Sequence, residues 1–219
     1  MQEINDKKEE GVVIKKALFL GLIVVAAVAL SLNSANALPV SPGQQIKITD
    51  AGGTGGGEFT VRNSSNSILF YSFCIELSET IALDTLYTID TISKSAVKGG
   101  IGGNPDPISD KTAWLYSNFV AGTLAGYSKF SATQGENALQ HAIWMFEQEE
   151  NVNTTNYFYN LANNSGWTGG YTGNVWAVNL KDATGADRQS ILVTATPEPF
   201  TMLLLGLGLV GLAGLRRKE

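Results

Sequence analysis

The sequence predicts an α+β fold in which an antiparallel β-sandwich or barrel carries an inserted helical subdomain. Three observations predict it. Glycine accounts for 24 of the 219 residues, which favours turn-rich β structure over a helical bundle. Segments in which apolar and polar residues alternate occupy both ends of the central region, residues 38–196. Between about residues 109 and 164 the hydrophobic period changes to that of a helix.

Several strands are expected before the helical insert. Residues 44–49 and 58–62 alternate on either side of a glycine-rich stretch, which predicts two strands joined by a flexible loop or hairpin turn. Residues 68–77 form the strongest strand candidate because they are rich in Phe, Tyr and Ile. Residues 85–92 alternate in the same way, and a loop of Gly, Pro and Asn follows at 99–107.

The insert is expected to contain three helices. Residues 109–124 repeat their apolar side chains at helical spacing. Thr133 and Glu136 match a capping box, which predicts a helix with Thr133 as its N-cap that runs to about Glu150. Residues 156–163 predict a shorter third helix.

The pattern returns to strands after the insert. Residues 175–180 and 190–194 alternate and flank a polar turn at 181–189, so they predict a hairpin. Asp182 and Asp187 in this turn could suggest a calcium loop, but they lack the dense acidic spacing that such loops need. We therefore expect an ordinary turn there.

Composition excludes several classes of function. With 15 basic and 20 acidic residues the net charge is −5, which argues against nucleic acid as a partner. One His and one Cys exclude an intramolecular disulfide, a cysteine-based zinc site and any site that needs two histidines. Neither a nucleophile–His pair nor a carboxylate pair is legible in the sequence. We therefore expect no cofactor, no metal and no enzyme, and a hydrolase is the least favoured reading.

The first 37 residues have the layout of a secretory signal peptide. Four lysines precede an apolar stretch at 17–32, and Ala35-Asn36-Ala37 provides a small-x-small cleavage site. Cleavage by signal peptidase after Ala37 would start the mature chain at Leu38. The alternative is an uncleaved membrane anchor.

The tail, residues 197–219, has three parts in a fixed order. Pro197, Glu198 and Pro199 come first, an apolar helix is expected at 200–215, and two Arg and one Lys follow. Sixteen helical residues reach about 24 Å, which is shorter than the hydrocarbon core of about 30 Å. The alternative to a sorting signal is an ordinary C-terminal membrane anchor.

This tail resembles the PEP-CTERM sorting signal of Gram-negative bacteria. The resemblance implies that an exosortase recognises Pro197, Glu198 and Pro199 and processes the chain during export. It also implies that the tail holds the chain transiently in the inner membrane, as a transmembrane helix, before the protein reaches the cell surface or the extracellular matrix.

The single cysteine lies in the strongest predicted strand. In an extended strand, Phe73 and Ile75 belong to a fully apolar face, whereas Cys74 and Glu76 share the other. A lone Cys is most often a small buried hydrophobe, and an unpaired thiol in an exported protein will oxidise unless it is sequestered. Glu76 lies about 6.6 Å from Cys74 along the strand, and its ordinary fate is a solvent-facing carboxylate.

Gln140 lies on the apolar side of the helix predicted after Thr133. At 100° per residue it falls between Ile143 and Trp144, whereas His141 faces solvent. A Gln on a buried arc needs hydrogen-bond partners, because burial otherwise costs free energy. A satisfied core Gln is the alternative to a functional one.

Two short motifs together resemble bacterial thioester domains. These are Phe73-Cys74-Ile75-Glu76-Leu77 and Gln140-His141-Ala142-Ile143-Trp144, and Thr112-Ala113-Trp114-Leu115 resembles the helix between them. The resemblance spans roughly residues 59–167. It implies an internal thioester between the Cys74 sulfur and the Gln140 acyl group. Leu139 stands where related Gram-positive adhesins often have Thr.

The resemblance implies a covalent adhesion function at the cell surface or matrix. An amine or hydroxyl on a surface or matrix molecule would capture the Gln140 acyl group, and Glu76 is the acid nominated to accept a proton. The alternative is a non-catalytic structural protein of the extracellular polysaccharide matrix, in which Cys74 and Gln140 only pack together.

Overall fold

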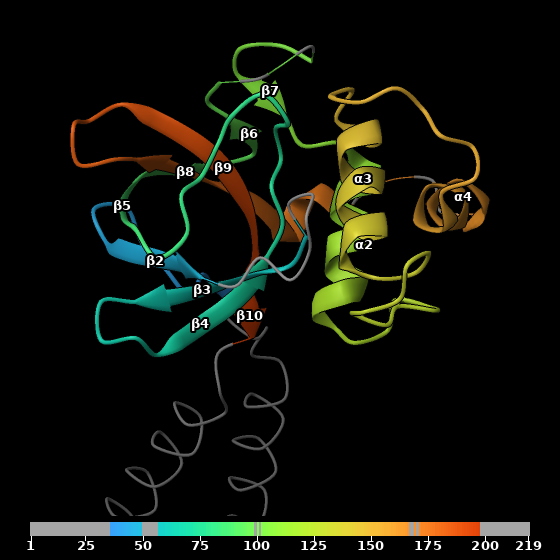
Figure 1. The fold of residues 1–219 in the computed structure, drawn as a ribbon, viewed down its shortest axis with the longest axis horizontal. Coiled ribbons are helices and arrows are strands. Elements are labelled where there is room, and N and C mark those ends of the chain that lie inside the picture. Colours follow the sequence, from blue (N-terminus) through green and yellow to red (C-terminus); the bar gives the residue numbers. More distant parts are fainter. Residues whose placement is uncertain are drawn as a thin grey trace, which may run out of the picture. The chain divides into compact units, whose positions relative to one another are not determined.

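The computed structural model in Figure 1 describes residues 36–49, 57–98, 100, 102–166, 169 and 171–197. Residues Leu38–Thr196 form one compact unit, which we call the body. The predicted apolar segments at 17–32 and 200–215 lie outside the described residues. Within the described ranges, no helix has the length and apolar character needed to cross a bilayer.

The body is built on a six-stranded sheet in which every pairing is antiparallel. The spatial order of the strands is β4-β3-β2-β5-β8-β9, so β4 and β9 are the two edges. Their bounds are β2 (Gln45–Thr49), β3 (Phe59–Asn63), β4 (Ile68–Ser72), β5 (Leu86–Ser93), β8 (Val175–Lys181) and β9 (Asp187–Thr194).

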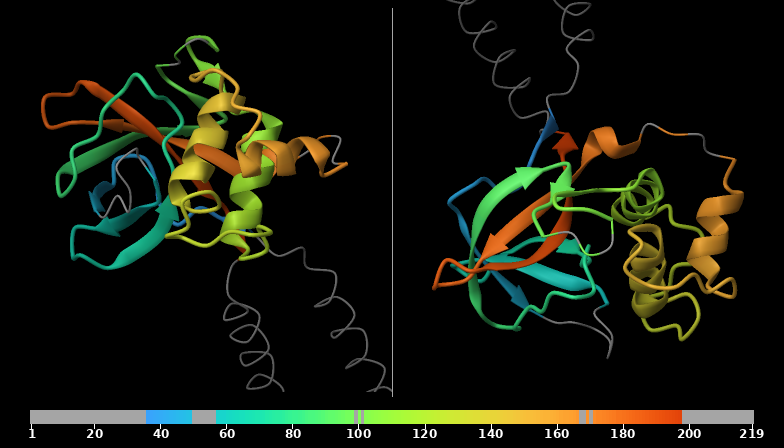
Figure 2. Two further views of the ribbon diagram at one scale, coloured as in Figure 1. Left: turned by 45° about the vertical axis from the view of Figure 1, so that its right-hand side comes forward. Right: turned by 90° about the horizontal axis from the view of Figure 1, so that it is seen from above.

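The two edges of the sheet meet just after β4. The strand predicted over 68–77 ends at Ser72, but Cys74 forms an isolated antiparallel bridge with Ile191 of β9. The sheet therefore curls until its edge strands touch, which gives a barrel rather than a sandwich (Figures 1 and 2). We call this contact the seam.

Two buried clusters lie on opposite faces of the curled sheet. The alternation in β2 places Ile46 and Ile48 inside the barrel. The barrel core consists of Val40, Ile46, Ile48, Phe59, Val61, Cys74, Tyr87, Ile89, Trp144, Val178, Leu180, Ile191 and Val193. The second cluster joins the outer face to the helices and includes Phe73, Ile75, Tyr116, Leu139, Ile143 and Leu192.

Three helices form the predicted insert between β7 and β8, and they gather on one side of the barrel (Figures 1 and 2). They are α2 (Asp110–Val120), α3 (Glu136–Phe146) and α4 (Tyr157–Asn164). The side chains of Ser109 and Asn156 cap α2 and α4 by accepting backbone N–H groups. A 3₁₀ turn, η1 (Tyr171–Asn174), leads into β8.

The helix α3 begins later than the capping box predicts. Thr133 is not its N-cap, because Gly135 holds that position and makes no side-chain cap bond. The preceding residues instead fold into a tight turn, in which Ser128 N–H donates to Gln134 O at 2.9 Å and Glu136 N–H donates to Lys129 O at 3.1 Å. Backbone bonds thus replace the side-chain cap.

Four two-residue strands complete the described chain. Strands β6 (Ser95–Ala96) and β7 (Asp106–Pro107) pair with each other, so part of the predicted loop at 99–107 is ordered as a ladder. Strands β1 (Asn36–Ala37) and β10 (Thr196–Pro197) lie at the two ends of the described residues.

Candidate functional site

The hydrogen bonds across the seam do not use the backbone N–H and C=O of Cys74. Across the seam, Leu192 N–H donates to Phe73 O at 3.1 Å and Ile75 N–H donates to Ser190 O at 3.0 Å. These bonds flank the Cys74–Ile191 pair, which is therefore of the antiparallel type that exchanges no bonds of its own. The N–H and C=O of Cys74 consequently point away from β9.

The side chain of Gln140 meets both of these groups. Cys74 N–H donates to Gln140 Oε1 at 2.9 Å, and Gln140 Nε2 donates to Cys74 O at 2.8 Å. The two residues are 66 positions apart in the chain, and both are buried. Because Cys74 offers one donor and one acceptor, the orientation of the amide is fixed by its partners.

The helix α3 places Gln140 at this point, on the buried side of the helix that its periodicity predicts. Leu139 and Ile143 pack in the helix-side cluster, whereas Trp144, one turn after Gln140, enters the barrel core. Gln140 is 0% exposed. The helix is therefore anchored on both sides of the seam with Gln140 directed at Cys74.

Both faces of the Cys74 segment are covered. Phe73 and Ile75 contact the helix side, and Cys74 belongs to the barrel core. Burial, and to a lesser degree the charge of Glu76, raises the pKa of the Cys74 thiol well above its usual value. The thiol is thus neutral at physiological pH and sheltered from oxidants.

Glu76 is buried, so its reading as a solvent-facing carboxylate is wrong. The chain no longer runs as a strand here, and the carboxylate turns back to accept the N–H of Ser190 at 2.9 Å through Oε2. Gln189 Nε2 donates to the Glu76 carbonyl. Burial, opposed by the Ser190 bond and reinforced by Glu79, raises the pKa of Glu76 to about 8.

The second oxygen of Glu76 is one of several buried polar atoms that lack a hydrogen-bond partner within the described part of the chain. This atom, Oε1, is buried and has no hydrogen-bond partner there. The other oxygen, Oε2, is bound by Ser190, and Ser190 is itself held in place. Its Oγ donates to Asn179 Oδ1 at 2.6 Å, and Asn179 Nδ2 donates to Thr91 Oγ1 at 3.0 Å. The sequence carried no signal for this support from Ser190 and Asn179.

The helix α2 also supports the seam. The Tyr116 hydroxyl lies 2.7 Å from Tyr71 O and 3.0 Å from Leu192 O, so it bridges the two edge strands. Ser72 Oγ donates to Leu192 O at 2.6 Å. The carbonyl of Leu192 therefore accepts bonds from two elements, α2 and β4, beside Cys74.

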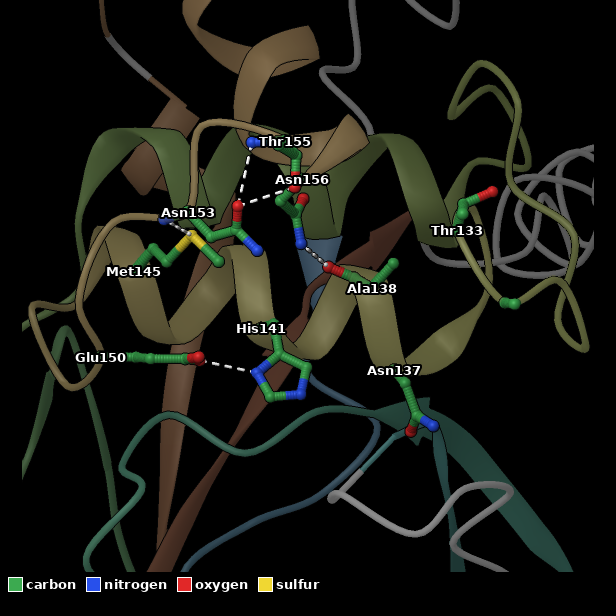
Figure 3. A pocket seen from close by; sticks show the side chains of 10 residues that line it. Thr133, Asn137, Ala138, His141, Met145, Glu150, Asn153, Thr155 and Asn156 are labelled. Carbon is green, nitrogen blue, oxygen red and sulfur yellow. Dashed lines mark hydrogen bonds and ion pairs between the residues drawn. The ribbon is translucent and has the colours of Figure 1, made fainter.

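Two other ionisable residues, His141 within α3 and Glu147 at its end, lie away from this site. His141 is 41% exposed and pairs with Glu150 at 2.6 Å, beside a surface hollow of about 370 Å³ over α3 (Figure 3). Glu147 is buried, but its carboxylate accepts Ser109 N–H at 3.1 Å at the start of α2. Burial raises the pKa of Glu147 to about 7.

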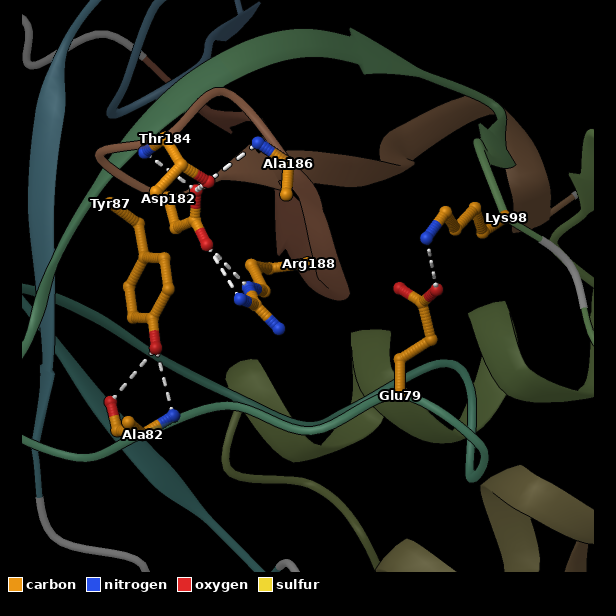
Figure 4. A network of polar contacts seen from close by, with 8 residues as sticks. All are labelled: Glu79, Ala82, Tyr87, Lys98, Asp182, Thr184, Ala186 and Arg188. Atoms are coloured by element: carbon orange, nitrogen blue, oxygen red, sulfur yellow. Dashed lines mark hydrogen bonds and ion pairs between the residues drawn. The ribbon is translucent and has the colours of Figure 1, made fainter.

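The turn between β8 and β9 is an ordinary polar turn. Asp182 accepts the N–H groups of Thr184 and Ala186 and pairs with Arg188 at 2.6 Å (Figure 4). These contacts occupy the carboxylate that a calcium ion would need. Across the described residues, no group of His, Cys, Asp and Glu side chains could hold a metal.

The candidate processing residues lie at or beyond the ends of the described chain. Ala37 and Pro197 lie at the ends of the described chain, whereas Glu198 and Pro199 lie outside it. Residues 195–218 match the family model described as the PEP-CTERM protein-sorting motif. The predicted sorting tail is thus confirmed, and the chain is an exported, cell-envelope-associated protein that an exosortase sorts. No curated protein and no solved structure matches the chain.

Proposed function

Because the chain carries a PEP-CTERM sorting motif, we propose that its body works at the cell surface or in the extracellular matrix as a covalent adhesion module. Its reactive group is an internal thioester between Cys74 and Gln140. The observation that carries the proposal is the pair of hydrogen bonds that seats the Gln140 carboxamide on the one cysteine of the chain.

The proposed bond balances without a cofactor. The Cys74 thiol adds to the Gln140 amide carbon, the carbon–nitrogen bond breaks, and the thiol proton leaves with the nitrogen as ammonia. An amine on a partner molecule then adds to the thioester carbon, and Cys74 leaves as a thiol with the amine proton. The product is a secondary amide on Gln140, and a hydroxyl partner would give an ester.

The seating of Gln140 supports this chemistry. Oε1 is the atom that becomes negative in both addition steps, and the Cys74 N–H already lies 2.9 Å from it. A fixed donor at such an oxygen stabilises the charge that develops there. Burial of both residues also keeps bulk water from the acyl carbon.

In this proposal Glu76 accepts the proton of the attacking nucleophile. It lies two residues from Cys74, and its charge already acts on the thiol. Because its pKa is raised to about 8, Glu76 acts as this base in its ionised form, in mildly alkaline solution, and the proton can then bind Oε1, which has no hydrogen-bond partner in the described chain.

A second candidate function is favoured by the same hydrogen bonds. The Gln140 amide already has partners on both atoms, so Cys74 and Gln140 can act as a purely structural clamp of a matrix protein. The clamp uses only the backbone of Cys74. In that case Cys74→Ala should cost about 1 kcal/mol of stability, whereas loss of a cross-link should cost about 4 kcal/mol.

Capture of a nucleophile tests the proposal. Methylamine added to the purified mature protein should open the bond, and peptide mapping should find the added mass on Gln140 with Cys74 newly open to alkylation. Host envelope extract should give adducts that survive boiling in detergent and reductant. Cys74→Ala should give neither product. Equal labelling of wild type and Cys74→Ala would contradict the proposal.

A further inference from the structure

The bond-forming step needs a proton donor that the proposed function does not yet supply. Amide nitrogen leaves readily only when it is protonated, and the buried Cys74 thiol is too weak an acid to ionise at neutral pH. A group beside Cys74 must therefore hold a proton and be able to release it.

The contacts of Glu76 indicate which of its two oxygens carries the proton. Oε2 accepts the Ser190 N–H at 2.9 Å, and the carbonyl oxygen of a neutral carboxyl is a better acceptor than its hydroxyl oxygen, so this contact favours a proton on the other oxygen. A protonated Glu76 therefore bears its hydrogen on Oε1, the buried atom that has no partner in the described chain. The carboxyl is fully buried, so this hydrogen is not shared with bulk water.

The surroundings of Glu76 keep it protonated at neutral pH. Burial is the main cause, and the nearby Glu79 adds to it. The cations on neighbouring elements are engaged elsewhere, since Arg188 pairs with Asp182 and Lys98 pairs with Glu79 (Figure 4). On the helix side, Glu149 of the segment after α3 accepts the N–H of Leu77.

We infer that Glu76, through Oε1, carries a proton from the Cys74 thiol to the departing nitrogen of Gln140. This inference rests on the proposed thioester. Oε1–H gives its proton to the amide nitrogen as the carbon–nitrogen bond breaks. The carboxylate so formed takes the proton of Cys74, so Glu76 ends unchanged and one ammonia is released.

The pH profile of bond formation separates this relay from simple thiolate attack. Thiolate attack quickens steadily as pH rises, because more thiol is ionised. The relay should instead slow above about pH 8, because Glu76 loses the proton that it must donate. The two routes thus predict opposite signs over the same range.

The test uses the mature chain from Leu38 with its tail in detergent. Chain recovered unfolded from inclusion bodies still has an intact Gln140 amide, and it is refolded at several values between about pH 6 and about pH 9.5. Loss of ammonia is followed by intact mass. Glu76→Gln keeps an oxygen for Ser190 N–H but carries no labile proton, and Glu147→Gln is the matched buried-carboxyl control.

The relay predicts that Glu76→Gln slows ammonia loss by about 100-fold or more, while Glu147→Gln behaves as wild type. Equal rates and equal pH profiles in wild type and Glu76→Gln would overturn the relay and leave the thioester standing. Absence of ammonia loss in every chain would overturn the thioester itself. If Glu76→Gln does not fold, the wild-type profile decides, and a rate that rises through about pH 8 contradicts the relay.

Discussion

At the scale of single residues, the amide of Gln140 takes the place of a neighbouring strand. Cys74 has a partner strand on one side only, because β3 pairs with β4 no further along than Ser72. Gln140 supplies the acceptor and the donor that the next strand would have offered. An unpaired N–H and C=O at this depth would destabilise the fold.

Removing this amide should therefore be costly. Gln140→Ala leaves two buried backbone groups without partners, and we expect the free energy of unfolding to fall by about 2–5 kcal/mol. Denaturant unfolding measures the change. Gln134→Ala, in the turn before the same helix, should shift stability by no more than about 0.5 kcal/mol. Equal effects of the two substitutions would mean that the amide does not hold the seam.

The sequence could predict one side of this site better than the other. Helical periodicity places Gln140 on the buried arc, and it is buried. Strand alternation predicts a solvent-facing Glu76, but alternation describes a continuing strand, and β4 ends at Ser72. The partner that buries Glu76 is Ser190, which lies 114 residues away. Such a contact leaves no local pattern.

At the scale of elements, the first turn of α3 controls the position of Gln140. Gly135 begins the helix five residues earlier, packed against the carbonyl oxygens of Lys129 and Ser131. A Cβ at this position would collide with both backbone groups. The turn at 128–134 and the helix must therefore approach each other at a residue without a side chain.

A methyl group at this contact should loosen the start of α3. Gly135→Ala is expected to lower the free energy of unfolding by about 1–3 kcal/mol, because backbone atoms must shift to make room. Gly173→Ala, where a Cβ meets nothing within 4 Å, is the control and should change stability by about 0.5 kcal/mol or less. Thermal unfolding of both variants checks this. Similar melting points for the two variants would show that the turn accommodates the added methyl group without loss of stability.

Elements were more predictable than their connections. The strands, the three helices and their order follow from hydrophobic period, which is a local property. The choice between sandwich and barrel depends on the Cys74–Ile191 bridge, which joins segments far apart in the chain. The start of α3 was misplaced for a related reason, since backbone bonds within the preceding turn displaced Thr133 as the cap.

At the scale of the whole molecule, two buried carboxyls should make the body less stable in alkali. Burial raises the pKa of Glu76 to about 8 and that of Glu147 to about 7. The unfolded chain releases these protons near about pH 4.3, so between that value and the folded pKa the native state holds more protons. Their contribution is therefore full below about pH 4.3, falls as pH rises above that value, and is lost once pH has passed the folded pKa values of about 7 and about 8.

The resulting slope can be measured. Between about pH 4.3 and its folded pKa, each carboxyl should lower the free energy of unfolding by at most about 1.4 kcal/mol per pH unit. Denaturant midpoints at a series of pH values give the slope for wild type. Glu76→Gln combined with Glu147→Gln should flatten it. A wild-type stability that rises between about pH 5 and about pH 8 would contradict the burial of these groups as acids.

The central claim is that Cys74 and Gln140 are joined, and intact mass tests it most directly. Mature protein purified fresh from the host, without exposure to amines, should weigh one ammonia less than its sequence. Its thiol should resist alkylation. Cys74→Ala and Gln140→Ala should each have the full mass of their sequence. A wild-type protein of full mass, with a thiol that is alkylated as soon as the chain is unfolded, would contradict the thioester and leave the hydrogen-bonded clamp.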